Sequence, residues 1–419
     1  FGCWFFTSVL LPHLAKQGYV RRGENAQPIH PSPAGTLGEY LKTRYEYSAI
    51  STSVVLVTLL GLLAVLLIEL YVGVSIFSIY LKEEYIHAAL VFISITVFVY
   101  TSLGGLAGVI KTDILQLLVV GFASICILVW SIYAAMTGKG PSIGIGDFLV
   151  EPPPIRKGLL LPYPLALNML FVNMLLTPCL LRNWQLLAAS ESEKSARKGI
   201  LSGIGTTAIL TGLFIVLGVF FFKAAYPDAS MSLEGMLSTL SQSDTIGAYI
   251  LFPLFFVACL TALLSTADSA LFPVVQSVLS DFRFSNTSRH TYRFTKVLMV
   301  TFLLLAITNA LYFIVFVALG FDLVSWLFTI FSVVIVPAPV IIYGILGSKR
   351  VLQGSAFRWA ALAAIWFGLV IALGFSYLGN RTGNLWLVQL NSPIAVLFGF
   401  IVLFIGRSVD AIRYPKRSE

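Results

Sequence analysis

The chain has 419 residues, of which 58% are hydrophobic and 11% charged, and its mean hydropathy is +0.91. Soluble domains carry about 25% charged residues, so this composition excludes a soluble globular protein and predicts an all-α integral membrane protein. The net charge of +8 is spread over several loops, which argues against a nucleic-acid surface and for basic loops on the cytoplasmic side.

The apolar runs predict about eleven membrane spans within one polytopic domain over residues 1–419. Every second connection is basic, and basic loops stay in the cytoplasm. This places the first residue outside, the C-terminus inside and a basic cytoplasmic tail at 407–419, in a multi-pass protein of the cell membrane (plasma or inner membrane). The predicted spans are 1–14, 49–80, 86–104, 113–136, 162–182, 200–222, 246–280, 293–318, 323–347, 357–377 and 391–406.

Two carboxylates in the first half of the chain are candidates for a role beyond packing. Glu69 lies within a predicted span, where it either pairs with a neighbouring helix or contacts a substrate or a proton. Gly104 and Gly108 permit a tight turn between two spans or a close contact between helices, and Asp113 begins the second of these spans. Spacing alone favours an N-cap role for Asp113 over a carboxylate at the inner end of an ion path.

Prolines interrupt two of the predicted spans. Those in 323–347 predict a kink, and those in 162–182 suit a discontinuous helix whose freed backbone groups line a cavity. The second of these spans also carries Asn168 and Asn173. Their amides either bond neighbouring helices together or contact a substrate.

The span 246–280 carries a face of small residues, because Ala262, Ser265, Thr266 and Ser269 are spaced at i, i+3, i+4 and i+7. Such a row is a common packing face between membrane helices. Asp268 lies beside it, and hydroxyl and carbonyl oxygens near a carboxylate suit a hard cation such as sodium. Periodicity leaves both interpretations open, and the carboxylate favours the ion site.

Signals of enzyme chemistry are lacking in the sequence. The four histidines are scattered without metal-ligand spacing, and no phosphate-binding Gly-rich loop or nucleophile elbow is present. The sequence therefore predicts no enzyme and no organic cofactor.

Two segments resemble the most recognisable stretches of the sodium/solute symporter family, which includes carriers of proline, glucose, sialic acid and choline. They are 99–116 (VYTSLGGLAGVIKTDILQ) and 262–271 (ALLSTADSAL), with weaker likenesses at 36–41 and 182–197. The resemblance implies a LeuT-type fold of two inverted five-helix repeats, with ion and substrate sites near the bilayer midplane. It also aligns the first span with the second core helix, so the family's first core helix is expected to be missing.

The resemblance assigns roles to the candidates above. Glu69 falls near an acidic position of the sugar carriers, and the span 162–182 is expected to contribute substrate contacts through Asn168 and Asn173. Asp268 stands where the family often has a serine. The residues implied for the common sodium site are Ala262 through its carbonyl, Ser265 and Thr266, and those for a second sodium site are Asp113, Ser265, Asp268 and Ser269.

The function expected from this resemblance is a sodium-coupled secondary symporter of a small polar organic solute, working by alternating access. Its partners would be sodium, the solute and the lipid bilayer. An alternative is a transporter-like sensor or an assembly subunit of a membrane complex without transport. The missing first core helix and the basic tail after Arg407 motivate that alternative.

Overall fold

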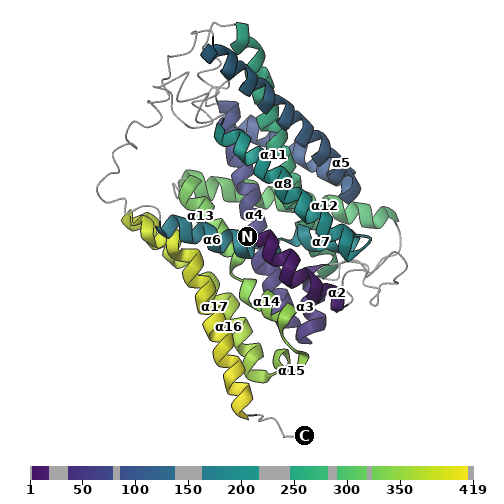
Figure 1. The fold of residues 1–419 in the computed structure, drawn as a ribbon, viewed down its shortest axis with the longest axis vertical. Helices are drawn as coiled ribbons and strands as arrows, with labels where there is room; N and C mark the ends of the chain where they lie inside the picture. The colour runs from purple at the N-terminus through teal and green to yellow at the C-terminus, as the bar shows by residue number, and fades with distance from the viewer. Residues whose placement is uncertain are drawn as a thin grey trace. The chain divides into compact units, whose positions relative to one another are not determined.

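The computed structural model describes residues 2–17, 36–78, 85–136, 163–216, 246–281, 290–318 and 323–413. All regular elements within these ranges are helical (Figure 1). A helix satisfies each backbone donor and acceptor within its own segment, which the hydrocarbon core of a bilayer requires. The elements are α1 (Gly2–Phe5), η1 (Phe6–Leu10), α2 (Leu11–Lys16), α3 (Leu37–Tyr45), α4 (Ser48–Ser78), α5 (Ile86–Met136), α6 (Tyr163–Cys179), α7 (Leu181–Ala189), α8 (Glu193–Val216), α11 (Ile246–Asp281), α12 (His290–Tyr312), η5 (Phe313–Ala318), α13 (Leu323–Ile335), α14 (Ala338–Leu346), α15 (Lys349–Leu352), α16 (Ser355–Thr382) and α17 (Leu385–Arg413).

The chain divides into two compact units. Unit 1 comprises Phe1–Val65, Leu161–Ser202 and Pro273–Glu419, and unit 2 comprises Leu66–Leu160 and Gly203–Phe272. The helices α4 and α11 therefore contribute residues to both units.

Seven helical stretches among the described residues are long and apolar enough to cross a membrane. The protein is therefore a multi-pass membrane protein, whereas the full count of about eleven spans and the orientation of the termini stay predictions. The seven stretches are Ser48–Ser78, Gly108–Val129, Tyr249–Leu279, Lys296–Val315, Trp326–Leu346, Ser355–Thr382 and Trp386–Arg413, and two shorter apolar helices cover Ala88–Val99 and Leu167–Cys179.

The predicted turn between the spans 86–104 and 113–136 is wrong, because both lie in the single 51-residue helix α5. At 1.5 Å per residue α5 would run about 77 Å if straight, far more than one crossing of a bilayer about 30 Å thick. Glycine permits a turn but does not require one, and no proline in 86–136 removes a backbone donor. Asp113 consequently lies inside a helix and is not an N-cap.

In unit 2, α4, α5 and α11 pack closely around a glycine. A Cβ added to Gly73 of α4 would lie 2.7 Å from Ile93 Cδ1 of α5 and 2.8 Å from Leu263 Cδ1 of α11. One turn further along α4, the ring of Phe77 meets Phe92 and Phe256 edge-on, with centroids 6.1 and 5.8 Å apart. These contacts hold the ion-site candidates of α5 and α11 in one bundle.

Unit 1 contains the hairpin of α16 and α17, which turns at Gly383 in the left-handed region (φ 66°). The two helices approach closely, since a Cβ on Gly406 would overlap the Cβ of Ala360. The predicted proline kink in 323–347 is confirmed: α13 ends at Ile335, and α14 begins at Ala338 after a short turn.

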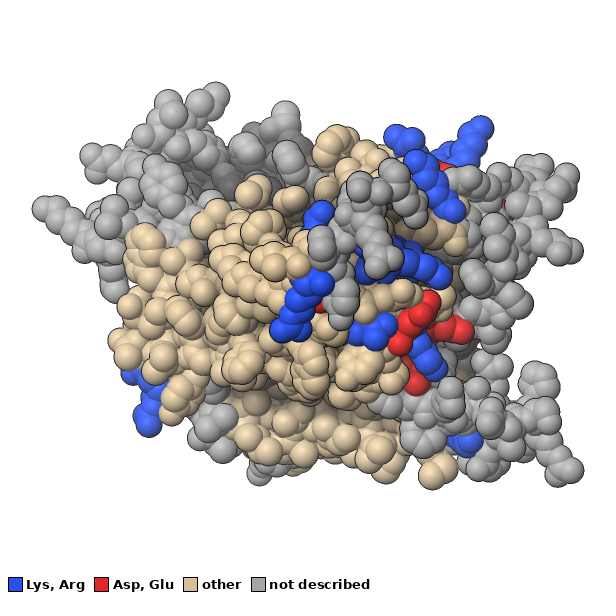
Figure 2. Space-filling view, turned by 90° about the horizontal axis from the view of Figure 1, so that it is seen from below, with Lys and Arg blue, Asp and Glu red and all other residues tan. Residues whose placement is uncertain are grey.

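Basic side chains occupy the last turns of five described helices of unit 1. They are His13 and Lys16 in α2, Lys42 and Arg44 in α3, Lys349 and Arg350 in α15, Arg381 in α16, and Arg413 in α17. Figure 2 shows that Lys and Arg are more prominent than Asp and Glu on the face seen from below. The positive-inside rule associates such residues with the cytoplasmic side.

Candidate functional site

The small-residue face of α11 is the accessible side of its middle section in unit 2. Ala262 and Thr266 are exposed, and Ser265 and Ser269 are half-buried, whereas the intervening Ala267 is buried. A helix repeats every 3.6 residues, so these four positions share a side, as the sequence predicted. Packing among the described residues therefore leaves this face accessible.

A hydrogen bond joins this face to α5. The Ser265 hydroxyl donates to Asp113 Oδ1 at 2.7 Å, between residues 152 positions apart in the chain. The Asp113 carboxylate, which spacing assigned to a helix cap, instead accepts a hydrogen bond from Ser265, the ion-site candidate of another helix. This contact brings together two oxygen-bearing groups that the resemblance assigned to a second sodium site.

Two further oxygens lie on the same face of α11. The Thr266 hydroxyl donates to the Ala262 carbonyl at 3.1 Å. Hard cations take oxygen ligands at about 2.3–2.6 Å, so two oxygens at this separation fit one ion with an angle of about 80° between them. The Thr266 oxygen keeps its lone pairs for an ion while its proton points to the carbonyl.

Asp268 lies on the buried side of α11. Its residue is completely buried, and the Ser269 hydroxyl donates to its Oδ1 at 3.3 Å. A buried carboxylate within a membrane helix is costly and is normally retained for a partner or an ion. The structure thus places Asp268 beside Ser269 and on a different side from the exposed Ala262 and Thr266.

Glu69 lies on the part of α4 that belongs to unit 2, one turn before Gly73, and is half-buried. Among the described residues, His, Cys, Asp and Glu side chains form no group of three that could hold a metal ion. An ion site in this region would therefore draw on hydroxyl and carbonyl oxygens as well as on carboxylates.

The two asparagines of α6 lie in unit 1. Asn168 is completely buried, and its Nδ2 donates to the Gln389 carbonyl of α17 at 2.5 Å. That carbonyl lacks its helical donor because Pro393, four residues later, has no N–H. Asn173 is exposed and donates to Met169 O of its own helix at 2.8 Å. Asn168 therefore bonds two helices together, and a substrate role for either residue stays a prediction.

A buried polar cluster in unit 1 was not predicted from the sequence. The Ser332 hydroxyl of α13 donates to Asn391 Oδ1 at 2.5 Å, and Asn391 Nδ2 donates to Ser376 Oγ of α16 at 2.6 Å. The signal available was the polar pair Asn391–Ser392 directly before Pro393 in an apolar run. These contacts bond α13, α16 and α17 together in the bundle interior.

The fold is similar to that of a solved transporter. No known protein-family model matches the chain, and no curated protein matches its sequence. A structure of a Na⁺-coupled sialic acid symporter in a substrate-bound outward-open state, with a novel Na⁺ site, matches with a TM-score of 0.69. The match covers 99% of this chain and 82% of that chain at 17% sequence identity. This chain therefore has the fold of that solved structure. At such low identity the likeness concerns the path of the backbone, and it extends over the α5 and α11 segments that carry the candidate oxygens.

Proposed function

We propose that the protein is a sodium-coupled symporter of a small polar organic solute. The observation that carries this proposal is the Ser265–Asp113 hydrogen bond of 2.7 Å on a chain with a symporter fold. Oxygen ligands of this kind, with one carboxylate, suit a hard cation of low charge. The proposal includes a LeuT-type arrangement in the cell membrane with the N-terminus outside.

Sodium would bind where the serine proton now lies. The Ser265 hydroxyl would rotate its proton away and offer a lone pair, so that the ion takes over the charge interaction with Asp113. The ion would then connect α5 to α11 more strongly than the hydrogen bond does. Sodium can drive transport only through its differential affinity for two conformations, and such a link between helices supplies it.

Most of the proposed ion ligands are oxygens of α11. We assign the common sodium site to the Ala262 carbonyl and the hydroxyls of Ser265 and Thr266. A second site would use Asp113, Ser265, Asp268 and Ser269. The proposed solute contacts are Glu69, Asn168 and Asn173.

The experiment that tests the proposal is sodium-dependent thermal stabilisation of the purified full chain, against potassium and choline. A ligand that binds only the folded state stabilises it by about 2.7 kcal/mol at 100 times its dissociation constant. Ser265→Ala removes one ligand and is expected to weaken sodium binding about tenfold, equivalent to about 1.4 kcal/mol. A saturable sodium-specific shift in the parent would justify a solute screen in sodium.

The matched control is Thr261→Ala, which removes an α11 hydroxyl that bonds only to Val257 O of its own helix among the contacts described. This variant is expected to bind sodium like the parent. Unchanged sodium binding in Ser265→Ala would refute the site. No sodium shift in the parent would instead favour a transporter-like sensor or assembly subunit.

A further inference from the structure

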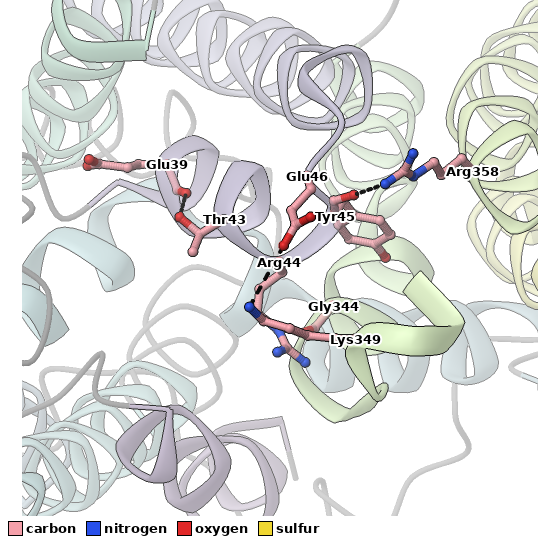
Figure 3. Close-up of polar contacts among 8 residues, drawn as sticks. All are labelled: Glu39, Thr43, Arg44, Tyr45, Glu46, Gly344, Lys349 and Arg358. Atoms are coloured by element: carbon pink, nitrogen blue, oxygen red, sulfur yellow. Dashed lines mark hydrogen bonds and ion pairs between the residues drawn. The ribbon is translucent and has the colours of Figure 1, made fainter. Parts of the chain in front are cut away.

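The short helix α3 is anchored at one end to the carbonyls that finish α14. Arg44 Nε donates to Gly344 O at 2.8 Å, and Arg44 Nη2 donates to Gly347 O at 2.5 Å. The buried hydroxyl of Tyr45 donates to Val340 O at 2.6 Å. Gly344 and Gly347 lie at the end of α14, where carbonyls lack an intrahelical donor, so the two Arg44 bonds fix the end of α3 there. The Tyr45 bond adds a contact near the start of α14, and Figure 3 draws the bond from Arg44 to Gly344.

The other end of α3 lies against the C-terminal end of α11, within unit 1. The Thr36 hydroxyl, which caps α3 by accepting from Glu39 N, donates to Asp281 Oδ1 at 2.5 Å. Gly38 allows this approach, since a Cβ there would lie 2.8 Å from Asp281 Cγ. The first turn of α3 is therefore packed directly on the Asp281 carboxyl group.

This second contact contains two carboxyl groups, and one oxygen of each lacks a hydrogen-bond donor among the described residues. Glu39 Oε2 and Asp281 Oδ2 are both buried, and neither has a hydrogen-bond partner among the described residues. Of the two cations on the same helix, Arg44 is bonded to α14 and Lys42 is exposed, and Figure 3 shows the Glu39 carboxyl pointing away from Arg44 and Lys349. A buried carboxylate oxygen without a donor costs free energy that a bound proton removes.

Burial and the neighbouring negative charge both favour the neutral form of Asp281. Burial raises the pKa of Asp281 from 3.8 to about 6, the Thr36 hydrogen bond opposes that rise, and the negative charge of Glu39 adds to it. Asp281 lies just beyond the span Tyr249–Leu279. The contact between α3 and α11 thus changes its charge within the range of cellular pH.

We propose that α3 is a proton-dependent latch on α11: a proton on Asp281 holds the first turn of α3 against the end of α11, and loss of that proton releases it. The bonds of Arg44 and Tyr45 keep the far end of α3 attached to α14 in both states. Release would therefore free only the N-terminal end of α3, and the helix would stay attached to α14. Since α11 also carries Ser265, the latch would make the mobility of the helix that bears this residue depend on pH.

The test is hydrogen–deuterium exchange of the α3 backbone in the full-length protein at pH 5 and pH 7.5, corrected for intrinsic exchange rates. Residues 37–40 are expected to exchange about tenfold more slowly at pH 5, which is the difference that a pKa of about 6 in the latched state and 3.8 in the released state gives between these two values of pH. Asp281→Asn keeps an acceptor for Thr36 without a titrating charge, so its exchange should be slow at both values of pH.

The matched control is Glu46→Gln, which neutralises an exposed carboxylate at the opposite end of α3 and should keep the pH response of the parent. Glu39→Gln removes the neighbouring charge and should move the midpoint of the response to lower pH, which serves as a second readout if Asp281→Asn folds poorly. Equal protection of α3 at both values of pH, or a pH response that survives in Asp281→Asn, would overturn the latch. The experiment uses neither sodium nor solute, so its outcome is independent of the transport assay.

Discussion

Of the side chains that join α3 to α14, Arg44 is the one whose substitution should lower the free energy of unfolding most. Its guanidinium donates two hydrogen bonds to the end of α14, and only one of the two accepting carbonyls has another donor described: Gly344 O also receives the Tyr40 hydroxyl at 3.3 Å. We expect Arg44→Met, which keeps the length of the side chain but removes the charge and the donors, to destabilise the protein. The Gly347 carbonyl would then lose its donor.

The expected loss in the free energy of unfolding follows from the hydrogen bonds of Arg44. A hydrogen bond from a charged donor contributes about 1.5–3 kcal/mol, and a cation at a helix C-terminus about 0.3–1 kcal/mol more. Arg44 is half-buried, so solvent competes for part of this, and we expect Arg44→Met to lose about 2–3 kcal/mol. Arg44→Lys should lose about half as much, because an ammonium keeps the charge but not the planar pair of donors.

The assay is the free energy of unfolding in a lipid or detergent environment that supports reversible unfolding. Arg407→Met is the control, because Arg407 is exposed on α17, and such a change typically alters stability by less than about 0.5 kcal/mol. If Arg44→Met and Arg407→Met were equally stable, the carbonyl anchor of α3 would be refuted. The latch would then have no fixed end.

Three further outcomes follow from the packing and charge of unit 1. Asn168→Ala should cost about 1–3 kcal/mol in the same assay, because it leaves the half-buried Gln389 carbonyl without its donor; parental stability would exclude that bond. Gly406→Ala should cost about 1–3 kcal/mol through overlap with α16, whereas Gly374→Ala, whose Cβ would meet nothing within 4 Å, should be neutral or stabilising. The raised pKa of Asp281 means that the folded state binds this proton more tightly, so its contribution of about 3 kcal/mol is complete below pH 3.8 and is lost as pH rises through about 6. Unfolding measured from pH 4 to 7.5 should show this slope in the parent and lack it in Asp281→Asn.

Helix positions were largely readable from the sequence. A helix forms from hydrogen bonds four residues apart, so apolar runs and their interruptions carry the information locally. The kink after α13 follows from prolines that lack a backbone donor, and the shared face of Ala262 and Ser265 follows from helical periodicity alone. The turn predicted at Gly104 failed because glycine only permits a change of direction.

Partnerships between distant residues were decided by the tertiary structure. No local rule joins Ser265 to Asp113, which lie 152 residues apart, or pairs Asn168 with the carbonyl that a proline frees in α17. The latch residue Asp281 has no sequence signal of its own, since its environment is made by α3, more than 200 residues earlier in the chain. Local hydrogen bonding and hydrophobicity determine which segments become membrane helices. Which side chains face each other depends on close packing between helices, and this packing cannot be read from the residues of one segment alone.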